Sequence, residues 1–337
     1  MADEPRVKNI TDLAKLAGVS AGTVSRALAD SPLISQKTRE TIQQIARDHG
    51  FRPNIMARNL RIKRAGAIGV VIPLGHETGQ HISDPFFMTL IGHLADALTE
   101  RGHDLLLSRV IPKDRNWLSQ IVDSGRVDGA IIIGQSDQSD VIDEVAQRYL
   151  PMVVWGASQS GQTHCSVGTN NRKGGMIAVQ HLIKQGCRRI AFFGDPAAPE
   201  IADRLLGCRE ALAEAGLDAD FQILPIHLTA DIAHPAISAW LAQTKSLPDG
   251  IVAASDVVAI TALRALSEKG ISVPQDIRIT GYDDLPFAAQ TIPPLTTVKQ
   301  DLVAGAAHLV DLLYRRIGGE RTDSVVLEPS LIVRASG

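Results

Sequence analysis

Residues 9–50 contain three short stretches in which apolar side chains recur at the spacing of an amphipathic helix. Each stretch follows a residue whose side chain can cap a helix by accepting a backbone hydrogen bond: Asn9, Ser20 and Ser35. The apolar positions expected to face inward are Leu13, Leu16, Val24, Leu28, Ile42 and Ile45. The third stretch stops at Gly50, so the pattern predicts an all-α head, with a shorter segment after Pro53.

From Ala67 onwards, short apolar runs alternate with amphipathic stretches, which is typical of a parallel sheet with crossover helices. The expected strands are Ile68–Ile72, Asp104–Ser108, Gly129–Ile133, Met152–Trp155, Ile190–Phe193, Ile251–Ala254 and Ile277–Tyr282. The expected helices are Phe86–Arg101, Arg172–Gln185, Ala202–Ala215 and Val257–Lys269. Because this region exceeds one average domain, we expect an α/β body with two doubly wound parallel-sheet subdomains.

A basic segment, Arg61–Arg64, precedes Ala65 and Gly66, and this composition is typical of a domain boundary. We expect a head at residues 1–52, a linking segment at 53–65 and a body at 66–337. The net charge of −3 conceals an asymmetry: residues 1–64 hold 12 Lys and Arg against 6 Asp and Glu, and the rest hold 22 against 31. A basic head indicates contact with a polyanion such as DNA, although a basic surface can also be merely solvated.

The sequence lacks the signals of several other protein classes. No apolar run approaches the roughly 20 residues of a membrane-spanning helix, and residues 1–8 lack the apolar region of a signal peptide, so we expect a cytoplasmic protein with no membrane partner. The three cysteines are odd in number and far apart, which opposes a disulfide framework or a cysteine zinc site. His76 and His81 lack the spacing of helical metal ligands, so we expect no metal. We expect the loop Gly75–His81 to be simply exposed, or alternatively to cover a ligand mouth.

Catalytic signatures are equally absent from the sequence. No glycine-rich nucleotide loop follows a strand, and the segment Gly156–Ser160 lacks the last glycine of a nucleophile elbow. Isolated carboxylates such as Asp195 could perform acid-base chemistry, but no nucleophile and base pairing is visible. We therefore expect neither an enzyme nor a cofactor.

A tight turn, Ala17-Gly18-Val19-Ser20, joins the first two expected helices, and its glycine can adopt the positive φ that a Cβ penalises. This arrangement predicts a helix-turn-helix, whose second helix places its N-terminal residues at base edges in the DNA major groove. The DNA-binding candidates there are Ser20, Ala21, Gly22, Thr23, Ser25 and Arg26. Arg26 can contact O6 and N7 of guanine, and the Ala21 methyl can contact a thymine methyl. Ser20 and Thr23 are better placed for phosphates.

The run from Leu13 to Leu28 closely resembles the start of the lactose and galactose repressor (LacI/GalR) family of transcription regulators. The resemblance continues through Ser35–Glu40 and Gly50–Asn54 and covers nearly the whole chain. It implies a body of the periplasmic-binding-protein type I kind, a homodimer or tetramer, and a palindromic operator in double-stranded DNA. The body alone also resembles solute-binding transport proteins, an alternative that the basic head and the missing signal peptide oppose.

The chain departs from the family pattern at the two leading positions of its recognition helix. Ala21 and Gly22 cannot donate side-chain hydrogen bonds to bases. Arg26, the main chain or the shape of the DNA must therefore supply more of the specificity.

In the family, the segment matching Asn54–Leu60 forms a hinge helix whose leucine wedges into the minor groove at the operator centre. The segment is too short to be a stable helix alone, so we expect it to become ordered on DNA. Asn54, Ala57 and Leu60 are therefore further DNA-binding candidates, with Leu60 as the wedge. The alternative is that Leu60 only packs within the linker.

Ligands of open α/β sheets bind beyond the C-terminal ends of the strands. Three segments resemble the effector-site segments of the family: Arg204–Leu212, Ala254–Asp256 and Ile279–Asp284. The effector-binding candidates are Phe86, Phe87, Gln135, Arg204, Ser255, Asp256 and Asp283. A guanidinium facing a carboxylate suits vicinal hydroxyls, so we expect Arg204 and Asp283 to hold a sugar, with a purine-like co-repressor as the alternative.

The resemblance further implies that the chain crosses between the two body subdomains three times, near residues 165, 294 and 325. One subdomain would then comprise residues 66–164 and 295–324, and the other 165–294 and 325–337. Helices within 86–101 and 300–317 would form the dimer face. Effector binding would close the subdomains and alter the hinge spacing, and whether this releases or strengthens DNA binding stays open.

Overall fold

A computed structural model describes residues 7, 9–51, 64–75, 79–135 and 137–337. Contacts divide the chain into two compact units, Met1–Ala65 and Gly66–Gly337, and each is described by itself. The hinge candidates Asn54, Ala57 and Leu60 lie outside the described residues.

The N-terminal unit contains the helices α1 (Ile10–Ala17), α2 (Ala21–Leu28) and α3 (Gln36–Asp48). Their N-caps are Asn9, Ser20 and Ser35, each accepting a backbone N–H, which confirms the expected helix starts. Gly18 ends α1 with φ +65°, in the left-handed region that glycine adopts without a Cβ clash.

A small apolar core holds these three helices together, with Leu13, Val24 and Ile42 at its centre. The expectation for Leu16 is wrong, because its side chain is 44% exposed. Leu13 and Ala14 already occupy the side of α1 that packs into this core, which leaves Leu16 on the flank.

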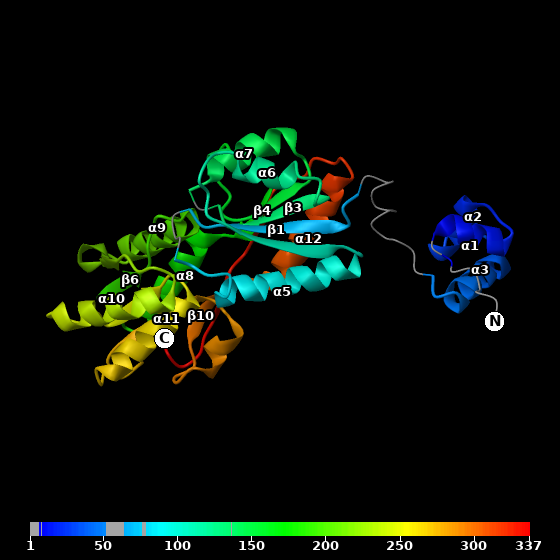
Figure 1. The fold of residues 1–337 in the computed structure, drawn as a ribbon. Helices are drawn as coiled ribbons and strands as arrows, with labels where there is room; N and C mark the ends of the chain where they lie inside the picture. The colour runs from blue at the N-terminus through cyan, green and yellow to red at the C-terminus, as the bar shows by residue number, and fades with distance from the viewer. Residues whose placement is uncertain (1–6, 8, 52–63, 76–78, 136) are drawn as a thin grey trace. The chain divides into compact units, whose positions relative to one another are not determined.

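The first sheet of the C-terminal unit has six parallel strands in the order β11-β5-β4-β3-β1-β2. The strands are β1 (Ala67–Pro73), β2 (Asp104–Val110), β3 (Gly129–Ile133), β4 (Met152–Trp155), β5 (Ser166–Thr169) and β11 (Val325–Leu327). The helices α5 (Pro85–Glu100) and α12 (Leu302–Ile317) pack on one face, and α6 (Trp117–Val122) and α7 (Ser139–Arg148) on the other (Figure 1). Both faces are covered, so the central strands are almost entirely apolar and buried.

The second sheet has the order β12-β10-β9-β8-β6-β7, in which only the β10–β12 pair is antiparallel. Its strands are β6 (Ile190–Phe193), β7 (Gln222–Leu224), β8 (Gly250–Ala253), β9 (Arg278–Asp283), β10 (Thr296–Lys299) and β12 (Ser330–Ile332). The helices α8 (Asn171–Lys184) and α9 (Pro199–Glu214) cover one face, and α10 (Ala230–Gln243) and α11 (Asp256–Glu268) the other. Short 3₁₀ turns occupy Asp218–Asp220 and Pro286–Gln290. The expected all-α head and α/β body with two doubly wound sheets are confirmed.

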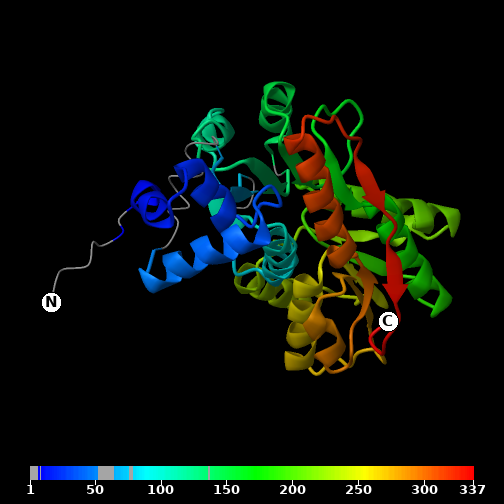
Figure 2. The same cartoon turned by 90° about the vertical axis from the view of Figure 1, so that its right-hand side faces the viewer.

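The chain passes between the two sheets after Thr169, after Lys299 and after Leu327, each a few residues later than expected. A short strand at each crossing extends the sheet that the chain is leaving, which places the crossings slightly after the expected positions near residues 165, 294 and 325. The last crossing is visible in Figure 2 as the red segment that runs from β11 to the C-terminus.

Candidate functional site

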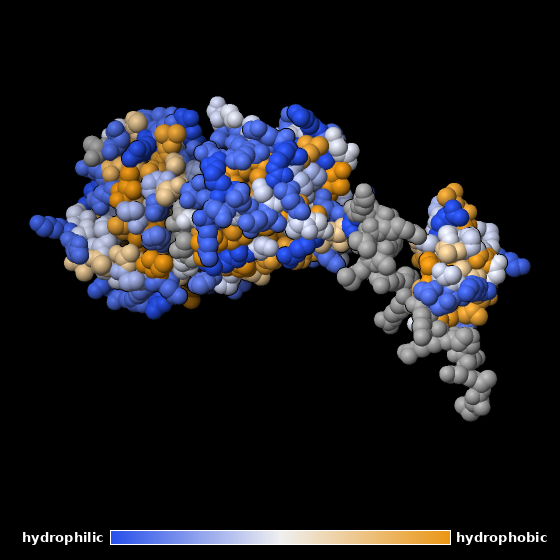
Figure 3. Space-filling view, turned by 45° about the horizontal axis from the view of Figure 1, so that its top comes forward, coloured by the Kyte–Doolittle hydropathy of each residue, from blue (hydrophilic) through white to orange (hydrophobic). Residues whose placement is uncertain are grey.

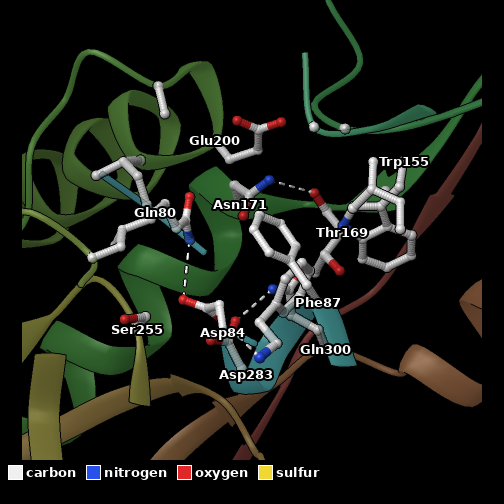
Figure 4. Close-up of a pocket in the computed structure, with 18 of the residues that line it drawn as sticks. Gln80, Asp84, Phe87, Trp155, Thr169, Asn171, Glu200, Ser255, Asp283 and Gln300 are labelled. Carbon is white, nitrogen blue, oxygen red and sulfur yellow. Dashed lines mark hydrogen bonds between the residues drawn. The ribbon is translucent and has the colours of Figure 1, made fainter. Parts of the chain in front are cut away.

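A pocket of about 860 Å³, measured out to its open mouth, lies where the C-terminal ends of the two sheets face each other. The first subdomain contributes Pro73, Leu74, Gln80, Asp84, Phe86, Phe87, Ile133, Gly134, Trp155, Gly156, Gly168 and Thr169. The second contributes Asn171, Ala198, Glu200, Ile201, Arg204, Leu228, Ser255, Val257, Asp283 and, after its last crossing strand, Gln300. The pocket thus joins an apolar, aromatic wall to a set of polar side chains (Figure 4).

The aromatic wall is formed by Phe86, Phe87 and Trp155. The Phe86 ring lies 5.9 Å from that of Phe87 and 6.3 Å from that of Trp155, measured between ring centres. Asp84 caps α5 by accepting the backbone N–H of Phe86 at 2.9 Å, which positions both phenylalanines in the first turn. Such a wall suits a flat ligand face or the C–H face of a sugar ring.

Arg204 supplies the one guanidinium among the described lining residues. It is 6% exposed, its Nε donates to Asn171 Oδ1 at 2.9 Å, and its Nη1 donates to the carbonyl oxygen of Ala254. Its guanidinium also stacks on the Tyr282 ring. The side chain is therefore held in one orientation before any ligand binds.

Close packing of α8 on α9 brings Asn171 and Arg204 together. A Cβ on Gly175 would overlap the carbonyl oxygen of Arg204, and a Cβ on Gly207 would overlap that of Arg172. Glycine at these two positions is what allows the two helix backbones to touch.

Asp283 ends β9 with an unusual backbone conformation, φ +119°, followed by Asp284 at φ +55°. Positive φ is costly for residues with a Cβ and occurs where a site demands it. Gln300 Nε2 donates to Asp283 Oδ1 at 2.7 Å. Asp284 accepts from Arg334 Nη2 at 2.6 Å, so it helps to hold the turn in which Asp283 lies.

Two carboxyl groups of the pocket have perturbed proton affinities. Burial raises the pKa of Asp283 to about 7, although the Arg204 guanidinium acts in the opposite direction. Burial also raises the pKa of Asp84, against hydrogen bonds from Gln80 and from the backbone of Phe86. Burial therefore favours the protonated form of Asp283 more than it does in a solvent-exposed carboxyl.

Five of the seven expected effector residues line this pocket: Phe86, Phe87, Arg204, Ser255 and Asp283. Gln135 and Asp256 do not. Gln135 is fully buried behind β3 and donates to the Ala157 carbonyl oxygen at 3.0 Å.

Asp256 is also fully buried, and it accepts from Thr297 Oγ1 at 2.6 Å and from the backbone N–H of Leu285 at 2.8 Å. Gly281 leaves room for it, since a Cβ there would overlap the Asp256 carboxylate. Its position after a strand is as expected, but its side chain turns back into the second sheet.

Seven further polar or aromatic side chains line the pocket without having been expected there: Gln80, Asp84, Trp155, Thr169, Asn171, Glu200 and Gln300. The sequence offered an indication for two of them, because Trp155 ends an expected strand and Asp84 precedes a proline at a helix start. The loop that contains Gln80 was expected to be simply exposed, with cover of a ligand mouth as the alternative, and Gln80 itself was not singled out. It is buried, donates to Asp84 Oδ2 at 3.0 Å, and is tethered by Arg109 Nη2, which donates to its carbonyl oxygen at 3.0 Å.

In the N-terminal unit, Gly22 and Arg26 are exposed on the same face of α2, four residues apart. A Cβ on Gly22 would lie 3.9 Å from Arg26 Nη2, so this guanidinium extends along the N-terminal turn of the helix. Ser20 Oγ accepts the Thr23 backbone N–H at 3.1 Å and pairs with the Thr23 hydroxyl at 2.9 Å. Ala21 and Ser25 are half-buried beside this face.

None of the described helices combines the length and apolar character needed to cross a membrane. No group of three or more His, Cys, Asp or Glu side chains within the described ranges could hold a metal ion.

A helix-turn-helix unit followed by a two-sheet body with a central pocket defines a DNA-binding regulator that responds to a small molecule. Residues 9–54 match the model of the bacterial regulatory proteins of the lacI family, and residues 179–337 match a periplasmic binding protein-like domain. The HTH-type transcriptional regulator CelR of Thermobifida fusca is 33% identical over 96% of this chain and 97% of its own length. The chain therefore belongs to the LacI family of transcription regulators, which are not enzymes.

Two solved structures show the same likeness. A Lac repressor dimer bound to operator and the anti-inducer ONPF superposes with a TM-score of 0.83 at 25% identity, covering 98% of each chain. A complex of the regulator CelR with cellobiose superposes with a TM-score of 0.68 at 30% identity, covering 98% of this chain and all of the other.

Proposed function

We propose that this regulator is a homodimeric repressor that binds a two-fold symmetric operator and responds to a sugar bound between its two body subdomains. The observation that carries the effector assignment is that Arg204 and Asp283 line the same pocket as the aromatic rings of Phe86 and Trp155, and that the Arg204 charge acts on the Asp283 carboxyl. Fixed donors and acceptors opposite aromatic rings match the alternating hydroxyl edges and C–H faces of a sugar. Cellobiose in the CelR complex supports this assignment.

The site residues follow from the same reasoning. Arg204, Asp283 and Ser255 bind hydroxyl groups, and Phe86, Phe87 and Trp155 cover the ring faces. Ser20, Ala21, Gly22, Thr23, Ser25 and Arg26 lie at the DNA, joined by Asn54, Ala57 and Leu60 of the hinge segment.

The dimer is supported by exposed apolar side chains on the first subdomain. Met88 on α5 is 49% exposed and Val303 on α12 is 62% exposed, and these two helices pack against each other. Figure 3 shows a face of the body on which hydrophobic residues form small patches among hydrophilic ones. Covering such patches by a second copy stabilises a dimer.

The proposed function is tested with the full chain in two steps. An operator is first selected from random DNA, and its symmetry is read from the enriched sequences. Neutral sugars are then added to the protein–operator complex, and the DNA affinity is measured. A palindromic operator whose affinity shifts with at least one sugar supports the proposal, whereas an asymmetric site or a complex indifferent to every sugar contradicts it.

A purine effector is a second candidate, favoured by one observation. Phe86 and Trp155 lie 6.3 Å apart at the wall of the pocket, and aromatic rings also stack on nucleobases. Hypoxanthine, guanine and adenine are therefore included beside the sugars. A shift in operator affinity with a purine alone would replace the sugar assignment.

A further inference from the structure

The pocket carries more acidic than basic side chains. Its charged lining residues, within the described part of the chain, are Asp84, Glu200, Arg204 and Asp283, and neither lysine nor histidine is among them. In Figure 4, Glu200 lies on one side of Asn171, and Asp84 and Asp283 lie on the other. A ligand in the pocket is therefore flanked by carboxyl groups on two sides.

The single guanidinium is already compensated by groups of the protein. Arg204 donates to Asn171 and to the Ala254 carbonyl oxygen, and one face of it is covered by the Tyr282 ring. The positive charge of Arg204 also lowers the pKa of the Asp283 carboxyl, against the effect of burial. An anionic ligand group would have to compete with Asp283 for this cation.

Helix N-termini are the other common anion receptors, because their first N–H groups lack partners within the helix. Four helices, α5, α8, α9 and α11, begin at residues that line or adjoin this pocket, and side chains of the protein cap three of these starts. Asp84 caps α5, and Asn170 caps α8 by accepting the backbone N–H of Lys173. The remaining two helices follow the same rule.

In α9, Pro199 has no N–H to offer at the first position, and Glu200 places a carboxylate in the first turn. In α11, Ser255 accepts the backbone N–H of Val258, and the backbone of Asp256 is hydrogen-bonded to the Asp283 carboxyl. Side chains thus cap α5, α8 and α11, and the first turn of α9 contains a proline and a carboxylate.

From this charge arrangement we infer that the effector is an uncharged sugar, and that Asp84 and Glu200 exclude sugar phosphates and sugar acids. The inference deepens the proposed function and rests on it. Asp84 and Glu200 act as specificity-determining residues, because like charges brought together in a partly desolvated site repel each other strongly.

The test compares neutral sugars with their anionic counterparts on the full chain at pH 8. Each set pairs a neutral sugar with its phosphate or acid: D-glucose with glucose 6-phosphate and glucuronate, D-ribose with ribose 5-phosphate, D-galactose with galacturonate, and cellobiose with cellobionate. Thermal unfolding identifies the ligands, and calorimetry measures their Kd. We expect at least one neutral sugar to bind and its anionic counterpart to bind about 100-fold more weakly or not at all.

The three possible failures have different meanings. A sugar acid or phosphate that binds as well as its neutral counterpart overturns the inference and leaves the sugar assignment standing. A neutral purine that binds when no sugar does overturns the sugar assignment and with it this inference about sugars. A chain stabilised by neither sugars nor purines contradicts both.

Variants test the residues directly. Glu200→Gln keeps the size of the side chain and an acceptor for the Ala157 N–H, which the carboxylate accepts at 3.4 Å. We expect it to reduce the discrimination between neutral and anionic counterparts about tenfold, and D84N/E200Q to reduce it further. Glu214→Gln, exposed near the end of the same helix, is the control and should leave the ratio unchanged. An unchanged ratio in both pocket variants, with Tm values retained, would show that these carboxylates do not select the ligand.

Discussion

The guanidinium carbon of Arg204 lies 3.7 Å from the centre of the Tyr282 ring. This stacking fixes the plane of the guanidinium, while Asn171 and the Ala254 carbonyl oxygen fix its rotation within that plane. Arginine and lysine are not equivalent in such a setting, because only the planar fork can stack and donate in fixed directions.

Arg204→Lys keeps the positive charge but removes this geometry. We expect effector affinity to fall by about 10- to 100-fold, which corresponds to the loss of one or two charged hydrogen bonds. Calorimetry with the sugar identified above measures the loss. Arg209→Lys, exposed on the same helix, is the matched control and should bind like the unmodified protein. If both variants bind the sugar with equal affinity, Arg204 does not take part in effector binding.

Asp283 makes the stability of the protein depend on pH. Its pKa is raised to about 7, so between pH 4 and pH 7 the folded state binds more protons than the unfolded state. The contribution of this carboxyl to stability therefore decreases as the pH rises through that window.

Asp283→Asn removes the titration, so the Tm of the variant relative to the unmodified protein should increase from pH 5 to pH 8. Each kcal/mol corresponds to roughly 2–4 °C in a domain of this size. Thermal unfolding of both proteins at the two pH values provides the measurement. A Tm difference that stays constant with pH, or moves the other way, contradicts the assignment.

Gly175→Ala places a Cβ against the carbonyl oxygen of Arg204, a backbone atom that cannot rotate away. We expect a loss of about 1–3 kcal/mol in stability, together with weaker effector binding because α9 and Arg204 must shift. Gly92→Ala in α5 is the control, since no atom lies within 4 Å of its added Cβ. Its Tm should stay the same or rise slightly. Equal Tm values for the two variants would argue against close contact of α8 and α9.

Arg26 is expected to read a guanine in each half of the operator. Arg26→Ala should weaken binding to the selected operator by about 1–3 kcal/mol per half-site and relax the preference at one base pair. Arg47→Ala, exposed on α3, removes the same charge and should weaken binding to all sequences alike. The comparison is made by titrating operator variants at fixed salt. Identical specificity profiles would exclude Arg26 as a base reader.

Leu60 lies outside the described residues, and its proposed role is tested on DNA. Leu60→Ala should weaken operator binding far more than binding to unrelated DNA, because only the operator complex contains the kinked central step into which the leucine wedges. Parallel titrations of operator and unrelated DNA measure both affinities. An equal loss of affinity for the two DNAs would show that Leu60 only packs within the linker.

Features that depend on neighbours in the sequence were predictable. Asn9, Ser20 and Ser35 cap helices through hydrogen bonds to backbone groups two or three residues away, so the helix starts are encoded locally. The longer strands were also predictable, because burial on both faces demands a continuous apolar run. The strands β7, β11 and β12 have three residues each, too few for such a run to stand out.

Features that depend on contacts between distant segments were not predictable from the sequence. Asp256 and Asp283 both follow or end a strand of the same sheet, yet only Asp283 reaches the pocket, because Thr297 and Leu285 bind the carboxylate of Asp256 inside the sheet. Gln80 reaches the pocket because Arg109, from the neighbouring strand β2, holds its backbone.

The amino-acid sequence by itself determined the helix-turn-helix, the alternation of strands and helices, and the residue types that end the strands, since these follow from local hydrogen bonding and from the period of apolar side chains. The tertiary structure alone decided which of those side chains share the pocket, where the chain crosses between the sheets, and that four helix starts adjoin the pocket, three of them capped by side chains. Those outcomes depend on contacts between residues far apart in the chain. No local sequence pattern specifies in which direction such a side chain points.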